Sequence, residues 1–367
     1  MYEKDPRVVL TLDAGGTNFV FSAVQAEHEV VEPVCLASNG HDLQACLQTT
    51  IEGFAKVKER APAAPVAISF AFPGPADYPH GIIGDLGNLP AFKGGVALGP
   101  MLEERFGIPV FINNDGDLFA FGEAKAGLLP WVNGLLAEAG SPKRFRNLFG
   151  ATFGTGFGAG IVRDGRLWIG DNSAAGEIWL LRDKLDPRSN AEESVSIRAV
   201  RRAYAERAGL GFEATPEPKE IYAIAKGARP GQREAALEAF RRLGEAAGDA
   251  LANAITLIDG LVVIGGGLTG AAELFLPELV AEMNRPFDSP SGSNPRLEIR
   301  AFNLEDPAER AAFVKGEARE IAVPGSGRKV AYDPLQRTAV GLSRLGTSRA
   351  TALGAYAFAL TALENGR

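Results

Sequence analysis

A chain of 367 residues is long enough for about two domains, and its apolar and charged fractions of 46% and 23% are those of an ordinary folded protein. The net charge of -7 argues against a nucleic-acid surface, which needs a basic patch, and no stretch reaches the roughly 18 uninterrupted apolar residues of a membrane span. The first residues have no apolar signal core, so we expect a cytoplasmic protein, and the two cysteines, Cys35 and Cys46, cannot form a disulfide framework.

The first pattern along the chain is an apolar run, Val8 to Leu12, followed by Asp13, two glycines and a threonine. A second apolar run, Phe19 to Val24, follows with no helix signal between them, so we predict two strands joined by a hairpin turn. The pattern contains neither a G-x-x-x-x-G-K-[ST] loop nor a G-x-G-x-x-G that opens a helix. Glycine turns let backbone N–H groups approach a phosphate, and Asp13 is placed to organise a metal ion there, but an ordinary hairpin turn explains the pattern equally well.

Two later strands are predicted to end in candidate ligand loops. The strand Val66 to Phe72 stops at Pro73-Gly74-Pro75, where Gly74 is either a backbone contact for a ligand or a plain turn. The strand Pro109 to Ile112 delivers an Asn-Asn-Asp cluster, residues 113–115, to its carboxyl end, where open α/β sheets place ligands. This position favours a functional carboxylate, with a simple N-cap of the following helix as the alternative.

The hairpin pattern occurs a second time, about 140 residues after the first. Asn147 to Phe153 is strand-like, Gly154-Thr155-Gly156 forms the turn, and Gly158 to Val162 is the return strand. Strand, small-residue phosphate turn and strand are therefore repeated within one chain. Two such hairpins facing a cleft are typical of the actin-like, hexokinase-like ATPases.

Further along the chain, Glu192 is predicted to open a helix that runs to Ala208, and the arginines of that helix are interpreted as its solvated face. A long helix, Gln232 to Leu257, leads into the strand Leu261 to Ile264. The turn that follows, Gly265-Gly266-Gly267-Leu268, suits the flat face of a nucleoside or is a tight strand-to-helix turn.

Two elements are predicted in the last part of the chain. Arg319 to Val323 and Arg328 to Tyr332, joined by Pro324-Gly325-Ser326-Gly327, indicate a protruding hairpin. A subunit contact, a lid flap and a surface decoration are all consistent with that hairpin. A last strand, near residues 338–343, precedes a helix from Arg349 to Leu363.

Taken in order, these motifs resemble those of the ROK family of bacterial sugar kinases and sugar-sensing repressors. The resemblance runs from about Val8 to the C-terminus and weakens between Leu181 and Asn190 and between Phe302 and Gln336. As an ordered set the motifs are specific, although each one alone is weak. They are Leu12-Asp13-Ala14-Gly15-Gly16-Thr17, Pro73-Gly74-Pro75, Asn88-Leu89-Pro90, Asn114-Asp115, Gly154-Thr155-Gly156, Gly176-Glu177-Ile178 and Gly265-Gly266-Gly267.

The resemblance implies a two-domain α/β fold of the actin-like, ribonuclease-H-like ATPase and hexokinase type, with a cleft between the domains. The small N-terminal domain is expected over residues 1–116. The large domain is expected over residues 117–348, with an insertion near 303–336. The C-terminal helix, within residues 349–367, is expected to pack back near the small domain, and the protein to be a homodimer.

The resemblance also implies the activity and the site residues. Asp115 would be the catalytic base of an ATP-dependent kinase that phosphorylates a hydroxyl of a hexose or amino sugar. The sugar would be bound by Gly74, Asn88, Asn114, Asp115, Glu177 and Glu192, the last of which lies four residues before Ser196 as in the family. Mg²⁺ would accompany ATP near Asp13. ATP itself would be bound by Asp13, Gly15, Gly16, Thr17, Asn18, Gly154, Thr155, Gly156, Gly265, Gly266, Gly267 and Leu268.

Two departures from the family pattern bear on the sugar and on zinc. Most members carry a histidine three residues after the glutamate of the Gly176-Glu177 motif, where this chain has Leu180. Most also carry a cysteine-rich zinc loop, whereas residues 185–190 here hold no cysteine and all histidines and cysteines precede residue 81. We therefore predict no zinc, because local ligands for it are absent. Which sugar is bound is left open.

Three functions compete for this pattern. A kinase is the first. A DNA-binding repressor of the same family would need a helix-turn-helix module before the first phosphate strand, and only seven residues precede Val8. A catalytically weak sugar- or nucleotide-binding sensor is the third, and ADP release on addition of sugar distinguishes it from the kinase.

Overall fold

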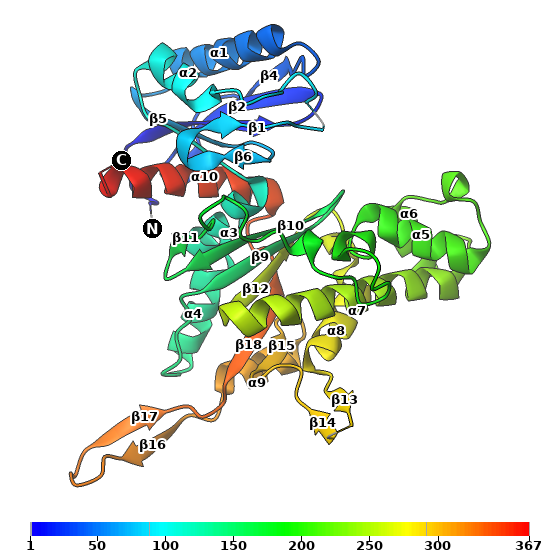
Figure 1. Ribbon diagram of the computed structural model, residues 1–367. Coiled ribbons are helices and arrows are strands. Elements are labelled where there is room, and N and C mark those ends of the chain that lie inside the picture. The colour runs from blue at the N-terminus through cyan, green and yellow to red at the C-terminus, as the bar shows by residue number, and fades with distance from the viewer. Residues whose placement is uncertain (1, 88, 291, 367) are drawn as a thin grey trace. The chain divides into compact units, whose positions relative to one another are not determined.

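The computed structural model describes residues 2–87, 89–290 and 292–366, which form two units (Figure 1). The first unit contains Met1–Gly127, Gly165–Ala175 and Leu345–Arg367, and the second contains Leu128–Asp164 and Gly176–Arg344. Each unit is built on its own mixed α/β sheet, which confirms the predicted fold class. Within the described residues, no helix is both long and apolar enough to cross a bilayer.

The first sheet begins with the predicted hairpin. Its strand order is β3-β2-β1-β5-β8, with β4 beside β2. The hairpin strands β1 and β2 are antiparallel, whereas β1, β5 and β8 run parallel. The strands are β1 (Val8–Ala14), β2 (Asn18–Gln25), β3 (His28–Glu29), β4 (Val34–Ala37), β5 (Pro65–Ala71) and β8 (Val110–Asn113), and this unit also holds the short strands β6 (Ala76–Asp77), β7 (Ile82–Ile83) and β11 (Arg166–Leu167).

Helices cover both faces of the first sheet. Helix α1 (Leu43–Arg60) packs on one face, and α10 (Thr347–Glu364) packs on the other, beside α3 (Asp115–Ala126) (Figure 1). A Cβ added at Gly122 of α3 would lie 1.9 Å from the Ala350 oxygen, and one added at Gly354 of α10 would lie 1.9 Å from the Leu118 oxygen. The two helices therefore meet backbone to backbone, which only glycine permits. Helix α2 (Leu98–Phe106) contacts β8 and ends at Gly107 with a left-handed cap.

Aromatic rings form the centre of the first unit. The rings of Phe21 and Phe54 meet edge to face at 5.1 Å, and Phe70 lies 5.6 Å from Phe54. All three side chains are fully buried, so this layer contributes both hydrophobic area and specific ring geometry. Cys46 is buried beside this layer, and burial raises the pKa of its thiol to about 11, whereas Cys35 is exposed.

The second unit repeats the sheet plan. Its hairpin strands β9 and β10 are antiparallel, and the sheet continues from β9 through β12 and β18 to β15 in parallel pairs. The strands are β9 (Leu148–Phe153), β10 (Phe157–Arg163), β12 (Leu261–Gly265), β15 (Arg300–Asn303) and β18 (Arg337–Leu342). The helices are α4 (Leu128–Glu138), α5 (Ile197–Ala208), α6 (Pro218–Ala225), α7 (Arg233–Ile258), α8 (Ala272–Asn284) and α9 (Pro307–Lys315), with α7 packed on α5, α6 and α8.

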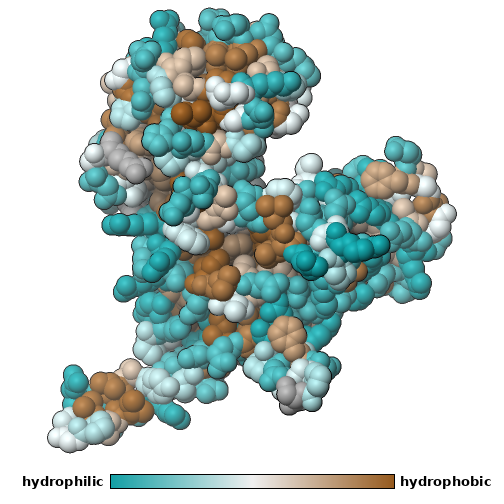
Figure 2. All heavy atoms as spheres, in the orientation of Figure 1, coloured by the Kyte–Doolittle hydropathy of each residue, from teal (hydrophilic) through white to brown (hydrophobic). Residues whose placement is uncertain are grey.

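Two short hairpins extend from the second unit (Figure 1). The first is β13 (Phe287–Ser289) with β14 (Gly292–Asn294), and the second is β16 (Arg319–Ala322) with β17 (Lys329–Tyr332), which confirms the hairpin predicted there. Apolar side chains lie exposed on β16 and β17, namely Ile321, Val330 and Tyr332 (Figure 2). A buried ion pair between Asp333 and Arg337, 2.7 Å long, closes the base of this hairpin.

One predicted helix start is wrong. Helix α5 begins at Ile197, and Glu192 lies earlier, in a short 3₁₀ turn over Ala191–Glu193. The reason is that Ser196 is the N-cap, with its Oγ accepting a hydrogen bond from the Ala199 N–H. The glutamate is therefore outside the helix, and its carboxylate is available for another contact.

Candidate active site

The first hairpin turn, residues 15–17, is hydrogen-bonded by a serine that follows β4. Ser38 donates its hydroxyl to the Gly16 carbonyl oxygen at 2.6 Å, and its N–H donates to the Thr17 oxygen at 2.9 Å. A Cβ added at Gly16 would meet no atom within 4 Å, so this side of the turn faces open space. Asp13 and Asn18 flank the turn with exposed side chains. Nothing in the sequence singled out Ser38.

The parallel register brings three strand ends together. Asp13 at the end of β1 is opposite Ala71 of β5, which is opposite Asn113 of β8. The residues that follow each strand therefore share one edge of the sheet, where α/β folds bind ligands. A cavity of about 810 Å³ lies here, lined by Asp13, Phe72, Pro73 and Asp115 among others. The structure thus groups Asp13 with Asp115, as the predicted chemistry requires.

Asp115 is the first residue of α3, and it is not the helix cap. The cap is Asn114, whose Oδ1 accepts from the Gly116 N–H at 2.8 Å. Asp115 is one of the residues that line the cavity and is exposed to solvent, although many protein atoms lie around its carboxylate. This desolvation raises the pKa of Asp115, hydrogen bonds from the backbone of residues 115 and 116 lower it, and the Asp13 charge raises it further. A raised pKa suits a carboxylate that must accept a proton.

Gly74 and Asn114 both lie against the hydroxyl of Tyr78, a residue that the sequence did not single out. Tyr78 donates its hydroxyl to the Phe72 carbonyl oxygen at 2.9 Å and accepts from Asn114 Nδ2 at 3.4 Å. A Cβ at Gly74 would lie 3.0 Å from the Tyr78 hydroxyl oxygen, so the glycine makes room for this contact. No motif around Tyr78 distinguishes it from a core tyrosine. Asn88, the other predicted sugar contact of this unit, lies outside the described residues.

The second hairpin turn, residues 154–156, is contacted at both ends by the segment 192–197. The Phe157 N–H donates to Glu192 Oε2 at 3.0 Å, and the Ile197 N–H donates to the Gly154 oxygen at 2.8 Å. A Cβ added at Gly156 would lie 2.5 Å from Glu192 Oε2. The predicted sugar-binding glutamate therefore packs directly on the predicted phosphate turn.

The third glycine turn adjoins the second. Strand β12 pairs in parallel with β9, and Leu268 donates its N–H to the Phe153 oxygen at 3.0 Å. Gly266 has a φ of +95°, and a Cβ there would lie 2.3 Å from the same Phe153 oxygen, so the position requires glycine. The residues predicted to hold phosphate and adenosine in this unit thus lie at one sheet edge.

Glu177 directly precedes a 3₁₀ turn over Ile178–Leu180. Its carboxylate accepts a hydrogen bond from the Trp179 indole N–H, and Leu180, at the histidine position of the family, is 57% exposed. Trp179 thus supplies a polar contact to Glu177 from a position two residues along the chain.

Hydrogen bonds and ion pairs order the loop where the family has zinc ligands. The buried Asp183 accepts from the Ser194 hydroxyl at 2.6 Å and from the Leu185 N–H at 2.9 Å. Lys184 lies 2.6 Å from Glu282 and 3.1 Å from Glu245. Burial lowers the pKa of Lys184, but these two carboxylates outweigh it and leave the pKa raised.

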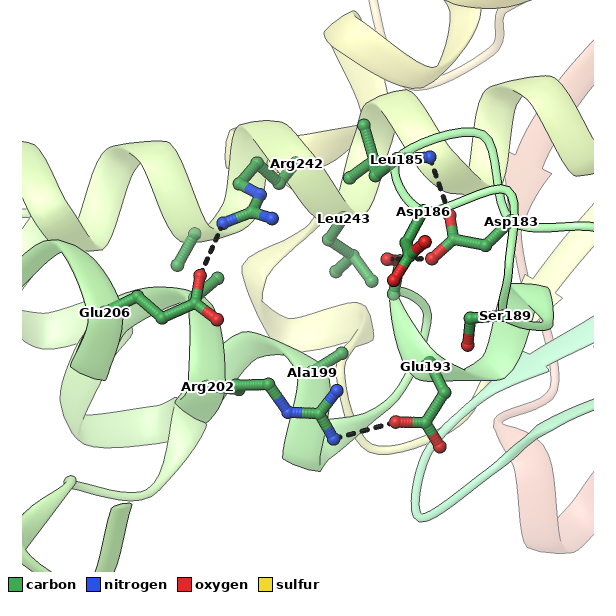
Figure 3. Close-up of a pocket in the computed structure, with 13 residues that line it drawn as sticks. Asp183, Leu185, Asp186, Ser189, Glu193, Ala199, Arg202, Glu206, Arg242 and Leu243 are labelled. Carbon is green, nitrogen blue, oxygen red and sulfur yellow. Dashed lines mark hydrogen bonds and ion pairs between the residues drawn. The ribbon is translucent and has the colours of Figure 1, made fainter. Parts of the chain in front are cut away.

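This loop, α5 and α7 enclose a polar pocket of about 160 Å³ (Figure 3). Arg202 pairs with Glu193 at one edge of it and Arg242 pairs with Glu206 at another. No three His, Cys, Asp or Glu side chains come together as a metal centre in the part of the chain that the structure describes. That the protein binds no zinc stays a prediction.

Known proteins resemble this chain over most of its length. The sequence profile described as the ROK family matches residues 9–308. A solved glucokinase from Parabacteroides distasonis is 57% identical, covering 98% of this chain and 99% of its own, with a TM-score of 0.92. An N-acetyl-D-glucosamine kinase from Vibrio cholerae is 29% identical over 70% of this chain and 83% of its own. A ROK glucokinase from Streptomyces griseus, solved with glucose and AMPPNP, has 19% identity and a TM-score of 0.60 over 95% of this chain and 98% of its own.

Proposed function

The chain belongs to the ROK family and is an ATP-dependent sugar kinase, and on that premise we propose that glucose is its acceptor and Asp115 its general base. The observation that supports the role of Asp115 is its place at the start of α3 in the wall of the cavity that Asp13 also lines, together with its raised pKa. The choice of glucose is supported by the 57% identity to a glucokinase over nearly the whole chain, against 29% to an N-acetyl-D-glucosamine kinase.

In the proposed reaction, a sugar hydroxyl attacks the γ-phosphorus of ATP while Asp115 accepts the hydroxyl proton. The new P–O bond forms as the bond between the γ-phosphorus and the bridging oxygen breaks, and ADP leaves. General-base assistance of this kind contributes about 10²–10⁴-fold. We propose that Asn114, Gly74, Glu177 and Glu192 bind sugar hydroxyls. A site that pairs hydroxyls discriminates strongly, because a missing partner leaves buried polar groups unsatisfied.

Backbone N–H groups of the two glycine turns are proposed to bind the phosphates, and residues 265–268 the adenosine. Asp13 fits Mg²⁺ that arrives with the nucleotide, since Mg²⁺ is commonly held by one or two carboxylates together with substrate phosphates. When bound, Mg²⁺ would neutralise charge that develops on the phosphate oxygens. We further propose that the enzyme works in the cytoplasm as a homodimer.

The test is a substrate panel. Purified protein with Mg-ATP is given glucose, mannose, N-acetylglucosamine and N-acetylmannosamine, and ADP is detected by a coupled assay. We expect the highest kcat/KM on glucose. A preference for an N-acetylated sugar would refute the proposed acceptor but keep the kinase. Sugar binding in calorimetry without ADP release would instead identify a sensor.

A further inference from the structure

Arg198, in the first turn of α5, connects two carboxylates that precede the helix. Its Nη2 donates to Glu192 Oε1 at 2.8 Å and to Glu193 Oε1 at 2.7 Å. The guanidinium is therefore not simply part of a solvated helix face, as the sequence alone suggested. It binds both Glu192, which is predicted to bind sugar, and the neighbouring Glu193.

The other oxygen of Glu192 faces the phosphate turn. Glu192 Oε2 accepts the Phe157 N–H, and the missing side chain of Gly156 leaves the space that this carboxylate fills. A continuous series of contacts thus runs from Arg198 through Glu192 to the backbone of the turn. Because Arg198 is positive, it also compensates the charge that Glu192 places beside a turn proposed to receive phosphates.

We infer that Arg198 is a positioning residue for phosphoryl transfer, which holds the Glu192 carboxylate against the second phosphate turn and offsets its charge there. The inference rests on the proposed function, because it assumes that Glu192 binds sugar and that residues 154–157 bind phosphate. It adds one requirement to these assumptions. The affinities for sugar and for ATP both depend on Arg198, which lies outside the proposed sugar site and the proposed phosphate site. Without Arg198, Glu192 is free to turn away from the sugar and repels incoming nucleotide.

Arg202 is the matched control. It lies one helical turn further along α5, and its side chain is 44% exposed, against 41% for Arg198. It pairs with Glu193 at 2.8 Å, and among the described residues it makes no hydrogen bond or ion pair with Glu192. If Arg198 only stabilised α5 or only paired with Glu193, replacing either arginine should lower kcat/KM by a similar factor.

The experiment compares Arg198→Ala, Arg198→Lys and Arg202→Ala in the full-length enzyme. We expect Arg198→Ala to lower kcat/KM by about 10–100-fold, with a higher KM for both sugar and ATP. Arg198→Lys should recover part of the loss, because it keeps the charge but not the planar donor geometry. Arg202→Ala should stay within about threefold of the parent, since exposed ion pairs contribute little. Melting temperatures should be similar for both alanine variants.

A double-mutant cycle decides whether Arg198 acts through Glu192. In a Glu192→Gln background, Arg198→Ala should cause no further loss, because the interaction that it supports is already removed. Additive losses, or equal losses from Arg198→Ala and Arg202→Ala, would overturn the inference. If Arg198→Ala does not fold, Arg198→Gln, which keeps most of the length and loses the charge, replaces it in the cycle.

The outcomes also separate this inference from the proposed function. An inactive parent enzyme on every sugar refutes the proposed function. An active parent with an impaired Glu192→Gln and an unimpaired Arg198→Ala refutes only the role of Arg198. An unimpaired Glu192→Gln refutes both the role of Glu192 and that of Arg198.

Discussion

The two glycine hairpins have the same sequence pattern and the same backbone plan, but different surroundings. The first turn is hydrogen-bonded by Ser38, and a Cβ at Gly16 would meet nothing within 4 Å. The second turn is tied at both ends by the segment 192–197, and a Cβ at Gly156 would meet a carboxylate oxygen at 2.5 Å. One turn faces open space and the other already holds an acidic side chain.

This difference leads us to expect that the two turns, both proposed to bind phosphate, do not have the same role. At the second turn, the Phe157 N–H, which is proposed to bind phosphate, donates instead to Glu192, which is proposed to bind sugar. On that proposal, phosphate binding and sugar binding are linked at this turn. Near the first turn, the two carboxylates that line the cavity are Asp13 and Asp115. We propose that Asp13 holds the metal and that Asp115 accepts the proton. We therefore expect substitutions near the two turns to have distinct kinetic effects.

The largest effect should come from Asp115 in the unit with the open turn. Asp115→Asn keeps the size of the side chain and its hydrogen bond to the Gly116 N–H, but it removes proton acceptance. Turnover should fall by about 10²–10⁴-fold, which is roughly 3–5 kcal/mol of barrier. Sugar affinity and melting temperature should change little. Steady-state kinetics and calorimetry measure these quantities.

Asp306→Asn is the control for that change. Asp306 caps α9 by accepting the N–H groups of Ala308 and Glu309, and asparagine caps a helix about as well. This variant should keep full turnover. Near-normal turnover in Asp115→Asn would remove the base from the mechanism and with it the functional difference between the two units. Asp117, the neighbouring acid of α3, is a poor control because it is 3% exposed.

Gly156→Ala and Gly16→Ala test the comparison directly. A methyl group at residue 156 displaces the Glu192 carboxylate, which lies at the end of a flexible side chain, so folding should survive while the Phe157 hydrogen bond is lost. We expect a stability loss of about 1 kcal/mol and a sugar KM about tenfold higher. Gly16→Ala should keep the melting temperature and the sugar KM but raise the KM for ATP. The same kinetic pattern from both variants would show that the turns are equivalent.

The pH profile tests the environment of Asp115. Its pKa is raised, so the proton-accepting form is lost as the pH falls through a value above the ordinary aspartate range of about 3.9. The acidic limb of kcat/KM should therefore lie at higher pH than that of an unperturbed carboxylate. The raised pKa also affects stability, because the folded state binds this proton more tightly than the unfolded state does. Asp115 therefore favours folding at low pH, whereas a carboxylate with a lowered pKa favours folding at high pH. A limb near pH 4 would contradict the assignment.

Local patterns in the sequence predicted the elements on which the site is built. Both hairpins, the strand before Asn114 and the strand before Gly265 follow from alternating or continuous apolar runs that end in turn residues. These signals are local, because a strand and its turn are consecutive in the chain. The start of α5 was predicted wrongly because local signals did not decide between its possible caps. Two acids and a serine within five residues are all candidates for the N-cap, and the cap is the serine.

Contacts between distant residues could not be predicted. Ser38 follows β4 and Tyr78 begins a short 3₁₀ turn, and neither stands in a distinctive motif, while Arg198 is one of several arginines on its helix. Nothing in the spacing tells which arginine faces Glu192, because that depends on where α5 begins. Motifs thus pointed to the groups that are proposed to carry the chemistry, while the residues that contact those groups were visible only in the structure.

Ser38→Ala should give the smallest effect. It tests how far the first turn depends on its hydrogen bond from Ser38. The hydroxyl of Ser38 is buried and donates to the Gly16 oxygen at 2.6 Å, but that oxygen belongs to an exposed residue and can accept a hydrogen bond from water instead. We expect a loss of about 0.5–1.5 kcal/mol in unfolding free energy and a KM for ATP only a few times higher, with the sugar KM unchanged.

Ser69→Ala is the matched control for Ser38→Ala, because Ser69 is a fully buried serine of β5 in the same sheet. Its Oγ has no hydrogen-bond partner among the residues that the structure describes, so its removal should not destabilise the protein. If Ser38→Ala behaved like Ser69→Ala in both denaturation and ATP kinetics, the first turn would keep its shape without Ser38. If instead Ser38→Ala raised the sugar KM as Gly156→Ala is expected to do, the first turn would be linked to the sugar as the second is. The asymmetry between the hairpins would then lie in their contacts and not in their functions.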